Sequence, residues 1–179
     1  KLITKSIWDF DMSKLIQFYR NKCTTDSGHY LSDILKWDAK QWEACHDFIQ
    51  WAFPLTEPSA YNPSAPLLSE DEINAFKSSK DIQMTITSVV ERAKRFLGFY
   101  SNEKPHWFKP RDHNMLRITR ILKFLNLVGR YEDMIEIYSW LINLDFKFPN
   151  IVSDETISYW IDAVDGPNFD LELFLFNKY

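Results

Sequence analysis

Four closely spaced prolines in the middle of the chain limit its fold more than any other feature. They are Pro54, Pro58, Pro63 and Pro66. Proline lacks the backbone N–H that a helix interior needs, and it keeps the residue before it out of the α region. Residues 54–68 therefore cannot form a regular helix. Because this stretch is bordered and interrupted by large apolar side chains, we expect an extended strap that packs across other elements.

The rest of the chain has the apolar periodicity of helices. Such segments are predicted at residues 9–20, 29–37, 38–53, 70–78, 81–100, 113–128, 130–144 and 155–164, with 169–176 a short terminal helix or tail. Residues that cap helix N-termini stand before several of them, namely Asp9 or Asp11, Asp38, Ser69, Asp112, and Ser153 or Asp154. The chain has 4 glycines in 179 residues, which is few for a hairpin-rich fold.

These patterns predict an all-α fold with one domain over residues 1–179. We expect a single irregular helical bundle of about seven to nine helices, with the strap at about residues 54–68 packed across it. Residues 143–179 are predicted to be an acidic C-terminal helical extension. The segment 130–144 is apolar on several faces, which favours deep burial or contact with a second copy of the chain, that is, a homo-oligomer.

Charge and cysteine content exclude several classes of protein. The net charge is −4, and the acidic residues concentrate between 150 and 179. A nearly neutral body with an acidic end lacks the basic face of a nucleic-acid binder. No stretch reaches the roughly 18 apolar residues of a membrane span, and no signal peptide opens the chain. Cys23 and Cys45 are not spaced as a CxxC pair or as paired metal ligands. We interpret them as free thiols of a reducing compartment, so we expect an intracellular protein, cytoplasmic or nuclear.

The sequence predicts no metal and no cofactor. His29, His46, His106 and His113 lack the spacing of metal ligands. The phosphate-binding loop, the nucleophile elbow and a Cys/His signature are also missing.

Two arginines of the segment 113–128 carry the most informative charges. On a helical wheel, Arg117 and Arg120 lie among Leu116, Phe124 and Leu127. A buried guanidinium must be paired, and its planar fork suits a carboxylate or a phosphate. One interpretation is an internal clamp, in which one of the two arginines grips Glu57 of the strap or a backbone carbonyl, and another is a solvated edge of the helix. The third is a site for an anion or a ligand carboxylate.

The wheel assigns the solvent face of this segment to Thr119, Lys123 and Asn126. In the segment 38–53, it places His46 and Gln50 at the edge of the apolar arc, beside Phe53. A boundary histidine is usually a hydrogen-bonded packing residue. It can also serve as an acid or base where a cleft is present.

Two runs resemble the N-terminal domain of the opioid growth factor receptor family. The first is His46-x-x-Ile49-Gln50-Trp51-x-Phe53-Pro54-Leu55-x-Glu57-Pro58-Ser59, followed by Asn62 and Ala65-Pro66-Leu67. The second is Asn114-x-Leu116-Arg117-Ile118-Thr119-Arg120-Ile121-Leu122-Lys123-x-Leu125-x-x-x-Gly129. The resemblance spans roughly residues 16–142. The loop at 101–112 is shorter here than in the animal proteins, and the chain lacks their repetitive polar C-terminal region.

The resemblance implies a receptor-type domain. Animal members of the family are described as enkephalin-binding, growth-regulating proteins found at the nucleus. Similar domains occur in bacterial and fungal proteins. The family brings no catalytic residues that could be assigned to this chain, so we expect a non-catalytic domain that binds a peptide or a protein.

Three functions remain open at this point. In the first, a binding site is formed by Arg117, Arg120, His46, Gln50, Trp51, Glu57, Asn62 and Asn114, with Trp51, Phe53 and Trp107 as walls. In the alternative, an uncharacterised enzyme uses His46 as acid or base beside Glu57, with the arginines as an anion site. In the third, tryptophans and tyrosines stack on single-stranded nucleic acid, which the acidic balance disfavours.

Overall fold

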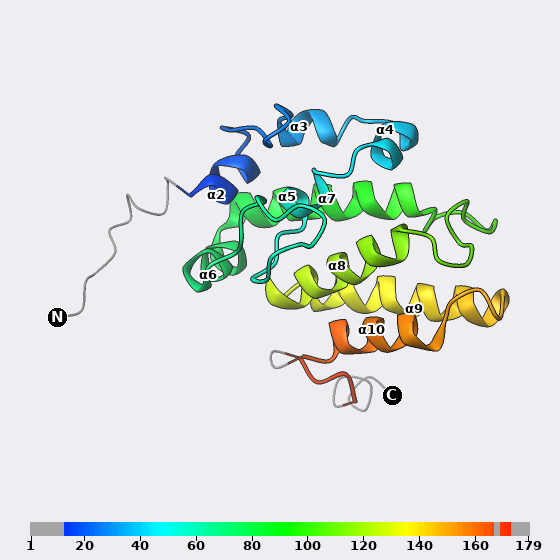
Figure 1. The fold of residues 1–179 in the computed structure, drawn as a ribbon. Helices are drawn as coiled ribbons and strands as arrows, with labels where there is room; N and C mark the ends of the chain where they lie inside the picture. Colours follow the sequence, from blue (N-terminus) through cyan, green and yellow to red (C-terminus); the bar gives the residue numbers. More distant parts are fainter. Residues whose placement is uncertain (1–12, 167–168, 173–179) are drawn as a thin grey trace. The chain divides into compact units, whose positions relative to one another are not determined.

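The computed structural model describes residues 13–166 and 169–172. Backbone contacts divide the chain into two compact units, residues 1–92 and 93–179, and each unit is described by itself. In the described ranges the regular elements are the helices α2 to α10, with no strand (Figure 1). The all-α prediction is therefore confirmed, whereas a single domain over residues 1–179 stays a prediction.

The N-terminal unit opens with three short helices and a fourth that follows a break. They are α2 (Lys14–Tyr19), α3 (Leu31–Ile34), α4 (Ala39–Ala44) and α5 (Ile49–Ala52). The predicted apolar side of α2 is buried, and the Ser13 hydroxyl caps the helix by accepting from the Ile16 amide at 3.3 Å. The caps expected at Asp9 and Asp11 lie outside the described residues.

The prediction of one continuous helix over 38–53 is wrong. Asp38 and Gln41 do form a capping box at the start of α4, but the helix ends at Ala44. Cys45 is extended, with φ −88° and ψ 131°, and helical structure resumes at Ile49. Since a helical wheel assumes an unbroken helix, its placement of His46 and Gln50 at one shared boundary does not hold.

Two longer helices complete the middle of the chain. The capping box of Ser69 and Glu72 begins α6 (Glu70–Ser78), as predicted. α7 (Lys80–Leu97) follows directly. It ends where Gly98 takes a positive φ of +81°, a conformation that other residues adopt at a cost.

Aromatic rings form much of the core of the N-terminal unit. Trp51 contacts Phe18 with ring centroids 5.3 Å apart, and Tyr19 contacts Phe76 at 4.6 Å. The Tyr19 hydroxyl donates to the Ala52 carbonyl at 2.5 Å, and complete burial raises the pKa of this phenol. Trp42 is also buried, and its indole donates to the Ile34 carbonyl at 2.9 Å.

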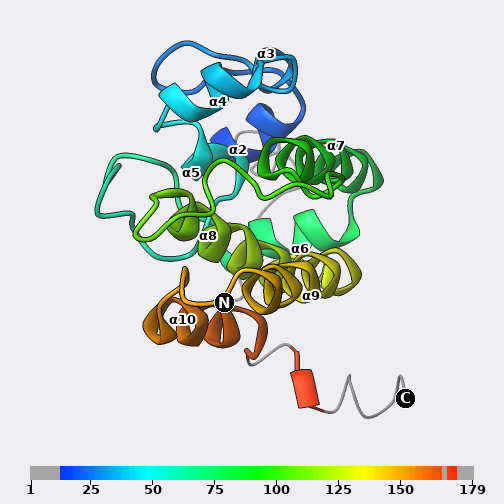
Figure 2. The ribbon, with the colours of Figure 1, turned by 90° about the vertical axis from the view of Figure 1, so that its right-hand side faces the viewer.

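The C-terminal unit is built on α8 (Asn114–Leu127), α9 (Tyr131–Lys147) and α10 (Asp154–Val164). Gly129, with φ +74°, separates α8 from α9 as the sequence predicts. Figure 2 shows α10 beside α8 and α9 at the edge of this unit. Ser153 caps α10 by accepting from the Thr156 amide at 3.2 Å. Of the terminal helix or tail expected at 169–176, residues 173–176 lie outside the described residues.

Two residues of α8 are placed differently from the prediction. Asn126, expected on the solvent face, is 5% exposed because α10 covers it. Its Nδ2 donates to the carbonyl oxygens of Ala163 and Val164, at 3.1 Å each. Leu116, expected among buried neighbours, is 52% exposed. A helix that packs from a distant part of the chain cannot be seen by a local wheel.

A buried ion pair joins the end of α7 to α9. Lys94 is 3% exposed, and its Nζ lies 2.5 Å from Glu136 Oε2 and 3.5 Å from Asp133 Oδ1. Arg130 Nη2 also pairs with Asp133, at 2.5 Å. A buried lysine needs such partners, because an uncompensated charge in the interior is costly.

One side of α9 is buried, and the other side exposes apolar residues, with Ile142 36% and Phe146 89% exposed. Contact of this helix with a second copy of the chain stays a prediction.

The contact between Asn126 and the end of α10 gives a stability prediction. A Cβ added at Gly166 would lie 2.9 Å from Asn126 Nδ2, so Gly166→Ala must displace this amide from the two carbonyls. We expect Gly166→Ala and Asn126→Ala each to lower the free energy of unfolding by about 1–3 kcal/mol, the cost of buried polar groups that lose a partner. The measurement is urea unfolding followed by circular dichroism.

In a double-mutant cycle, Gly166→Ala should cost much less once Asn126 is already alanine. Fully additive effects would contradict the contact.

Candidate functional site

The strap is a loop that is closed at its base. Its two ends are buried, and the Leu68 amide donates to the Leu55 carbonyl at 2.9 Å. Between these ends most residues are exposed, with Tyr61 at 82%. The strap is non-helical as predicted, and its packing against the unit is concentrated at its ends. Residues 56–64 are called the anchored loop below.

The buried side chain of Gln50 connects the break between α4 and α5 to this loop. Gln50 is 5% exposed. The side-chain amide takes the orientation in which its nitrogen and its oxygen are both hydrogen-bonded. Its Nε2 donates to the carbonyls of His46 and Asp47, at 3.1 Å each, and its Oε1 accepts from Ser59 Oγ at 3.3 Å. The break removes carbonyl groups from the helical ladder, and a buried carbonyl needs a donor. Gln50 supplies that donor.

Asn62 makes a second connection between the same segments. Its Nδ2 donates to the Asp47 carbonyl at 3.5 Å, and its Oδ1 accepts from Ser64 Oγ at 3.0 Å. Ser59 Oγ also accepts from the Tyr61 amide at 3.2 Å. Each of these bonds is worth about 0.5–1.5 kcal/mol. Together they hold a largely exposed loop in one conformation.

The predicted site residues Gln50 and Asn62 are thus brought together, because both side chains donate to the backbone carbonyl of Asp47. Ser59, the partner of Gln50 in the loop, was not predicted. Its presence in the first motif, nine residues after Gln50, was the available signal, but no local rule links a glutamine in a helix to a serine in a loop.

The aromatic residues proposed as groove walls lie in the core. Trp51 is 1% exposed, and Phe53 and Trp107 are 0% exposed, so none of them lines an open groove in this structure. The Trp107 indole donates to the Leu97 carbonyl at 2.9 Å. The Trp51 indole nitrogen has no hydrogen-bond acceptor within the part of the chain that the structure describes.

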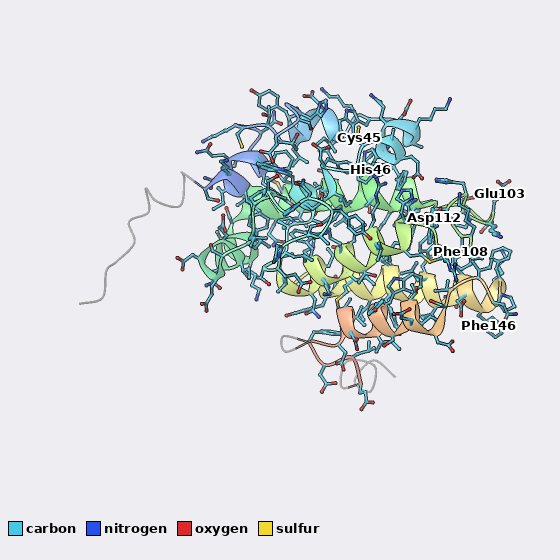
Figure 3. The ribbon with its side chains drawn as sticks, in the orientation of Figure 1. Cys45, His46, Glu103, Phe108, Asp112 and Phe146 are labelled. Carbon is cyan, nitrogen blue, oxygen red and sulfur yellow. The ribbon has the colours of Figure 1, made fainter. Side chains whose placement is uncertain are left out.

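His46 and Glu57 are both exposed. His46 lies in the linker between α4 and α5 (Figure 3), and its backbone carbonyl is one of the two acceptors of Gln50. Neither of the two hollows described below is lined by either residue. An acid/base pair of these two residues in a cleft stays a prediction.

The arginines of α8 differ in their burial. Arg117 is 6% exposed, as predicted, whereas Arg120 is half-buried. Arg117 Nη1 donates to Asn114 Oδ1 at 3.2 Å, and its guanidinium carbon lies 6.0 Å from the centre of the Phe96 ring. Asn114 is fully buried.

Asp112 starts this network at the N-terminus of α8. Its Oδ1 accepts from the Asn114 backbone amide and from Asn114 Nδ2, at 2.9 Å each. The N-cap residue of α8 is His113 and not the predicted Asp112, but Asp112 accepts from the first amide of the helix and orients the side-chain amide that contacts Arg117. Glu57 belongs to residues 1–92 and both arginines to residues 93–179. A clamp between them, and an anion site on them, both stay predictions.

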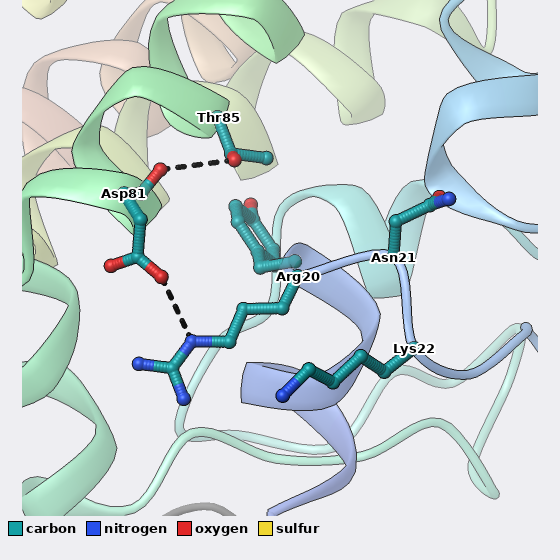
Figure 4. A pocket seen from close by; sticks show the side chains of 6 residues that line it. Arg20, Asn21, Lys22, Asp81 and Thr85 are labelled. Carbon is teal, nitrogen blue, oxygen red and sulfur yellow. Dashed lines mark hydrogen bonds and ion pairs between the residues drawn. The ribbon is translucent and has the colours of Figure 1, made fainter.

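One shallow hollow of about 500 Å³ lies beside α2 and the start of α7 (Figure 4). Arg20 Nε pairs there with Asp81 Oδ2 at 2.9 Å. The hydrogen bond from Ser79, with a smaller contribution from Arg20, lowers the pKa of Asp81. The guanidinium in this hollow is therefore paired with a carboxylate.

A second hollow, of about 850 Å³, lies beside the first turns of α9, where Arg130, Asp133 and Glu136 line it. Within the described residues, no group of three histidine, cysteine or carboxylate side chains is arranged to hold a metal. None of the helices in those residues is both long and apolar enough to cross a bilayer.

The role of Gln50 in anchoring the loop can be tested by hydrogen exchange. Gln50→Ala removes the donor for two carbonyls and the acceptor for Ser59, so we expect a loss of about 1–3 kcal/mol in the free energy of unfolding. Amides of residues 56–64 should exchange faster than in the unmodified chain. Asn74→Ala, which changes an exposed amide on α6, is the control. Unchanged exchange in the loop would contradict the anchoring role.

Comparison with known proteins adds to this geometry. The model of the opioid growth factor receptor conserved region matches residues 9–105. This range includes the first motif and ends before α8. No solved structure matches the chain.

Named relatives extend the similarity. The opioid growth factor receptor of Rattus norvegicus is 33% identical over 175 residues, covering 86% of this chain and 30% of the relative. The Homo sapiens receptor is 34% identical over 135 residues, covering 64% of this chain and 19% of the relative. Opioid growth factor receptor-like protein 1 of Mus musculus is 34% identical over 136 residues, covering 66% of this chain and 29% of the relative. This chain thus spans less than a third of the length of these relatives. With the family model matching more than half of its residues, the chain belongs to the opioid growth factor receptor family.

Proposed function

We propose that this domain is a non-catalytic binding module that takes up a peptide or a protein on the anchored loop. The observation that carries the proposal is the combination of exposure and fixation in residues 56–64. Hydrogen bonds of Gln50 and Asn62 fix the loop to the segment between α4 and α5, and the loop projects Tyr61 almost fully into solvent. The receptor names of the relatives agree with a binding role.

The fixed conformation of the loop matters because a mobile loop loses conformational entropy when it binds a partner. A loop that is already ordered avoids part of this cost. Pro58 and Pro63 restrict the backbone further, since each fixes its own φ. The exposed Tyr61 supplies a large aromatic surface with a hydroxyl at its tip, a residue type enriched at the energetic centres of interfaces. The partner that fits is one with an apolar pocket for this ring.

The family resemblance suggests the first ligand to test, because its animal members are described as enkephalin-binding. A fluorescently labelled enkephalin peptide is titrated with the full chain, and binding is followed by fluorescence anisotropy. We expect saturable binding that Tyr61→Ala weakens by about 2 kcal/mol, the level of an interface hot spot, or roughly 30-fold in Kd. Tyr30→Ala, at an exposed tyrosine outside the loop, is the matched control and should leave binding unchanged.

If enkephalin does not bind, the immobilised chain is used to select from a random peptide library. Selected peptides that lose affinity with Tyr61→Ala would support a loop that binds another sequence. Failure of both enkephalin and the library to bind would contradict the proposal, and so would binding that Tyr61→Ala and Tyr30→Ala affect equally.

A further inference from the structure

One face of α9 is open to solvent along most of its length. α9 packs on α8 and α10, and Figure 2 shows both of these helices on the same side of α9. The residues that are exposed on α9 recur at steps of three and four along the helix, so they share one face. They are Glu132, Glu136, Ser139, Ile142, Asn143 and Phe146.

The centre of this face is a stripe formed by Ile135, Ser139, Ile142 and Phe146, called the α9 stripe below. At 100° per residue these four positions lie within about 60° of one another. Phe146 is at the C-terminal end of the stripe (Figure 3), and its ring is 89% exposed. Apolar side chains that line up in solvent are typical of an interaction surface.

The two ends of the α9 stripe differ in shape. At the N-terminal end, Ile135, Ser139 and Tyr131 line the hollow of about 850 Å³, and Ile135 is recessed, at 8% exposed. The other end carries the projecting ring of Phe146. The two ends are about 16 Å apart along the helix axis. They cannot meet within one copy, but a two-fold axis between them brings each end against the other end of a second copy.

The two ends of α9 also differ in charge. Glu132 and Asp133 lie in the first turn, and Lys147 lies in the last. Within the part of the chain that the structure describes, Glu132 and Lys147 form no ion pair. Lys147 Nζ donates to the Asn102 carbonyl at 3.0 Å, which does not neutralise its charge. An antiparallel pair of α9 helices brings acidic and basic ends together and opposes the two helix dipoles, whereas a parallel pair aligns like charges.

We propose that α9 pairs with the α9 of a second copy of this chain, antiparallel and about a two-fold axis. Phe146 of each copy enters the hollow beside Ile135 of the other. This surface belongs to the C-terminal unit and is separate in sequence from the anchored loop, so its existence does not depend on what the loop binds.

The α9 stripe sets the register of the pair. With Phe146 of one copy opposite Ile135 of the other, Ser139 lies opposite Ile142, and the two-fold axis passes between them. The small side chain of Ser139 allows the helices to approach closely there. Lys147 of one copy and Glu132 of the other then differ by about 3 Å in position along the axis. An ion pair between them is within the reach of these long side chains.

The first test is sedimentation velocity of the full chain over a range of concentrations. A single pair of helices makes a small interface, so we expect a monomer–dimer equilibrium with a Kd on the order of 10 µM. Phe146→Ser should weaken it about tenfold or more, because an aromatic anchor is lost at both ends of the interface. Leu116→Ser replaces an exposed apolar side chain of α8 and should leave it unchanged.

Charge reversal tests the antiparallel register. Lys147→Glu and Glu132→Lys should each weaken the dimer of the single variant, because like charges then meet at both ends. An equal mixture of the two variants should recover dimers, because each end of the mixed pair again joins opposite charges. Weakened single variants that do not recover on mixing would overturn the antiparallel arrangement.

Thermal unfolding at a concentration where the chain is monomeric separates the interface from the fold. Because the Phe146 ring is almost fully exposed, Phe146→Ser should leave this Tm unchanged. A lower Tm would show that the ring supports the fold of the monomer, and it would overturn its role as an anchor. A chain that stays monomeric at every concentration would overturn the proposal, and so would a dimer that Phe146→Ser and Leu116→Ser weaken equally.

Discussion

The structure of the N-terminal unit depends on how one buried amide satisfies a broken helix. The chain leaves helical geometry at Cys45 and resumes it at Ile49, which removes the carbonyls of His46 and Asp47 from the usual ladder. Gln50 donates to both and accepts from Ser59 in the loop. A polar group that is buried without a partner costs about 1–3 kcal/mol. The break, the loop and the glutamine are therefore joined by hydrogen bonds through one side chain.

Features determined by local chemistry were predictable from the sequence. The prolines predict the non-helical loop, Ser69 and Glu72 predict the start of α6, and Gly129 predicts the end of α8, all as observed. Features determined by contacts with distant parts of the chain were not predictable from the sequence. Asn126 carries no local sign that α10 will cover it, and the break after Ala44 interrupts an apolar pattern that a continuous helix would also produce.

The same distinction applies to the candidate site. Arg117 was predicted to be buried, because it lies among apolar neighbours on the wheel, and it is 6% exposed. Its contact with Asn114 is to a neutral amide oxygen, so pairing with a carboxylate or a phosphate stays a prediction. The tryptophans and Phe53 were also singled out, but a sequence cannot tell whether an aromatic residue fills a core or lines a groove. The buried residues of the family motif are thus accounted for by fold chemistry, and the surface proposed for binding is what that chemistry leaves exposed, the loop around Tyr61.

The most direct test of this account is the hydrogen exchange of the Gln50 side-chain amide, measured by NMR on the full chain. If Nε2 is buried and bonded to the two carbonyls of the helix break, its protons should exchange far more slowly than those of the exposed amide of Asn74. The protection should fall when Ser59 is replaced by alanine, because the loop then loses its contact with the same side chain. Exchange of the Gln50 amide as fast as that of Asn74 would contradict the central role given to this residue.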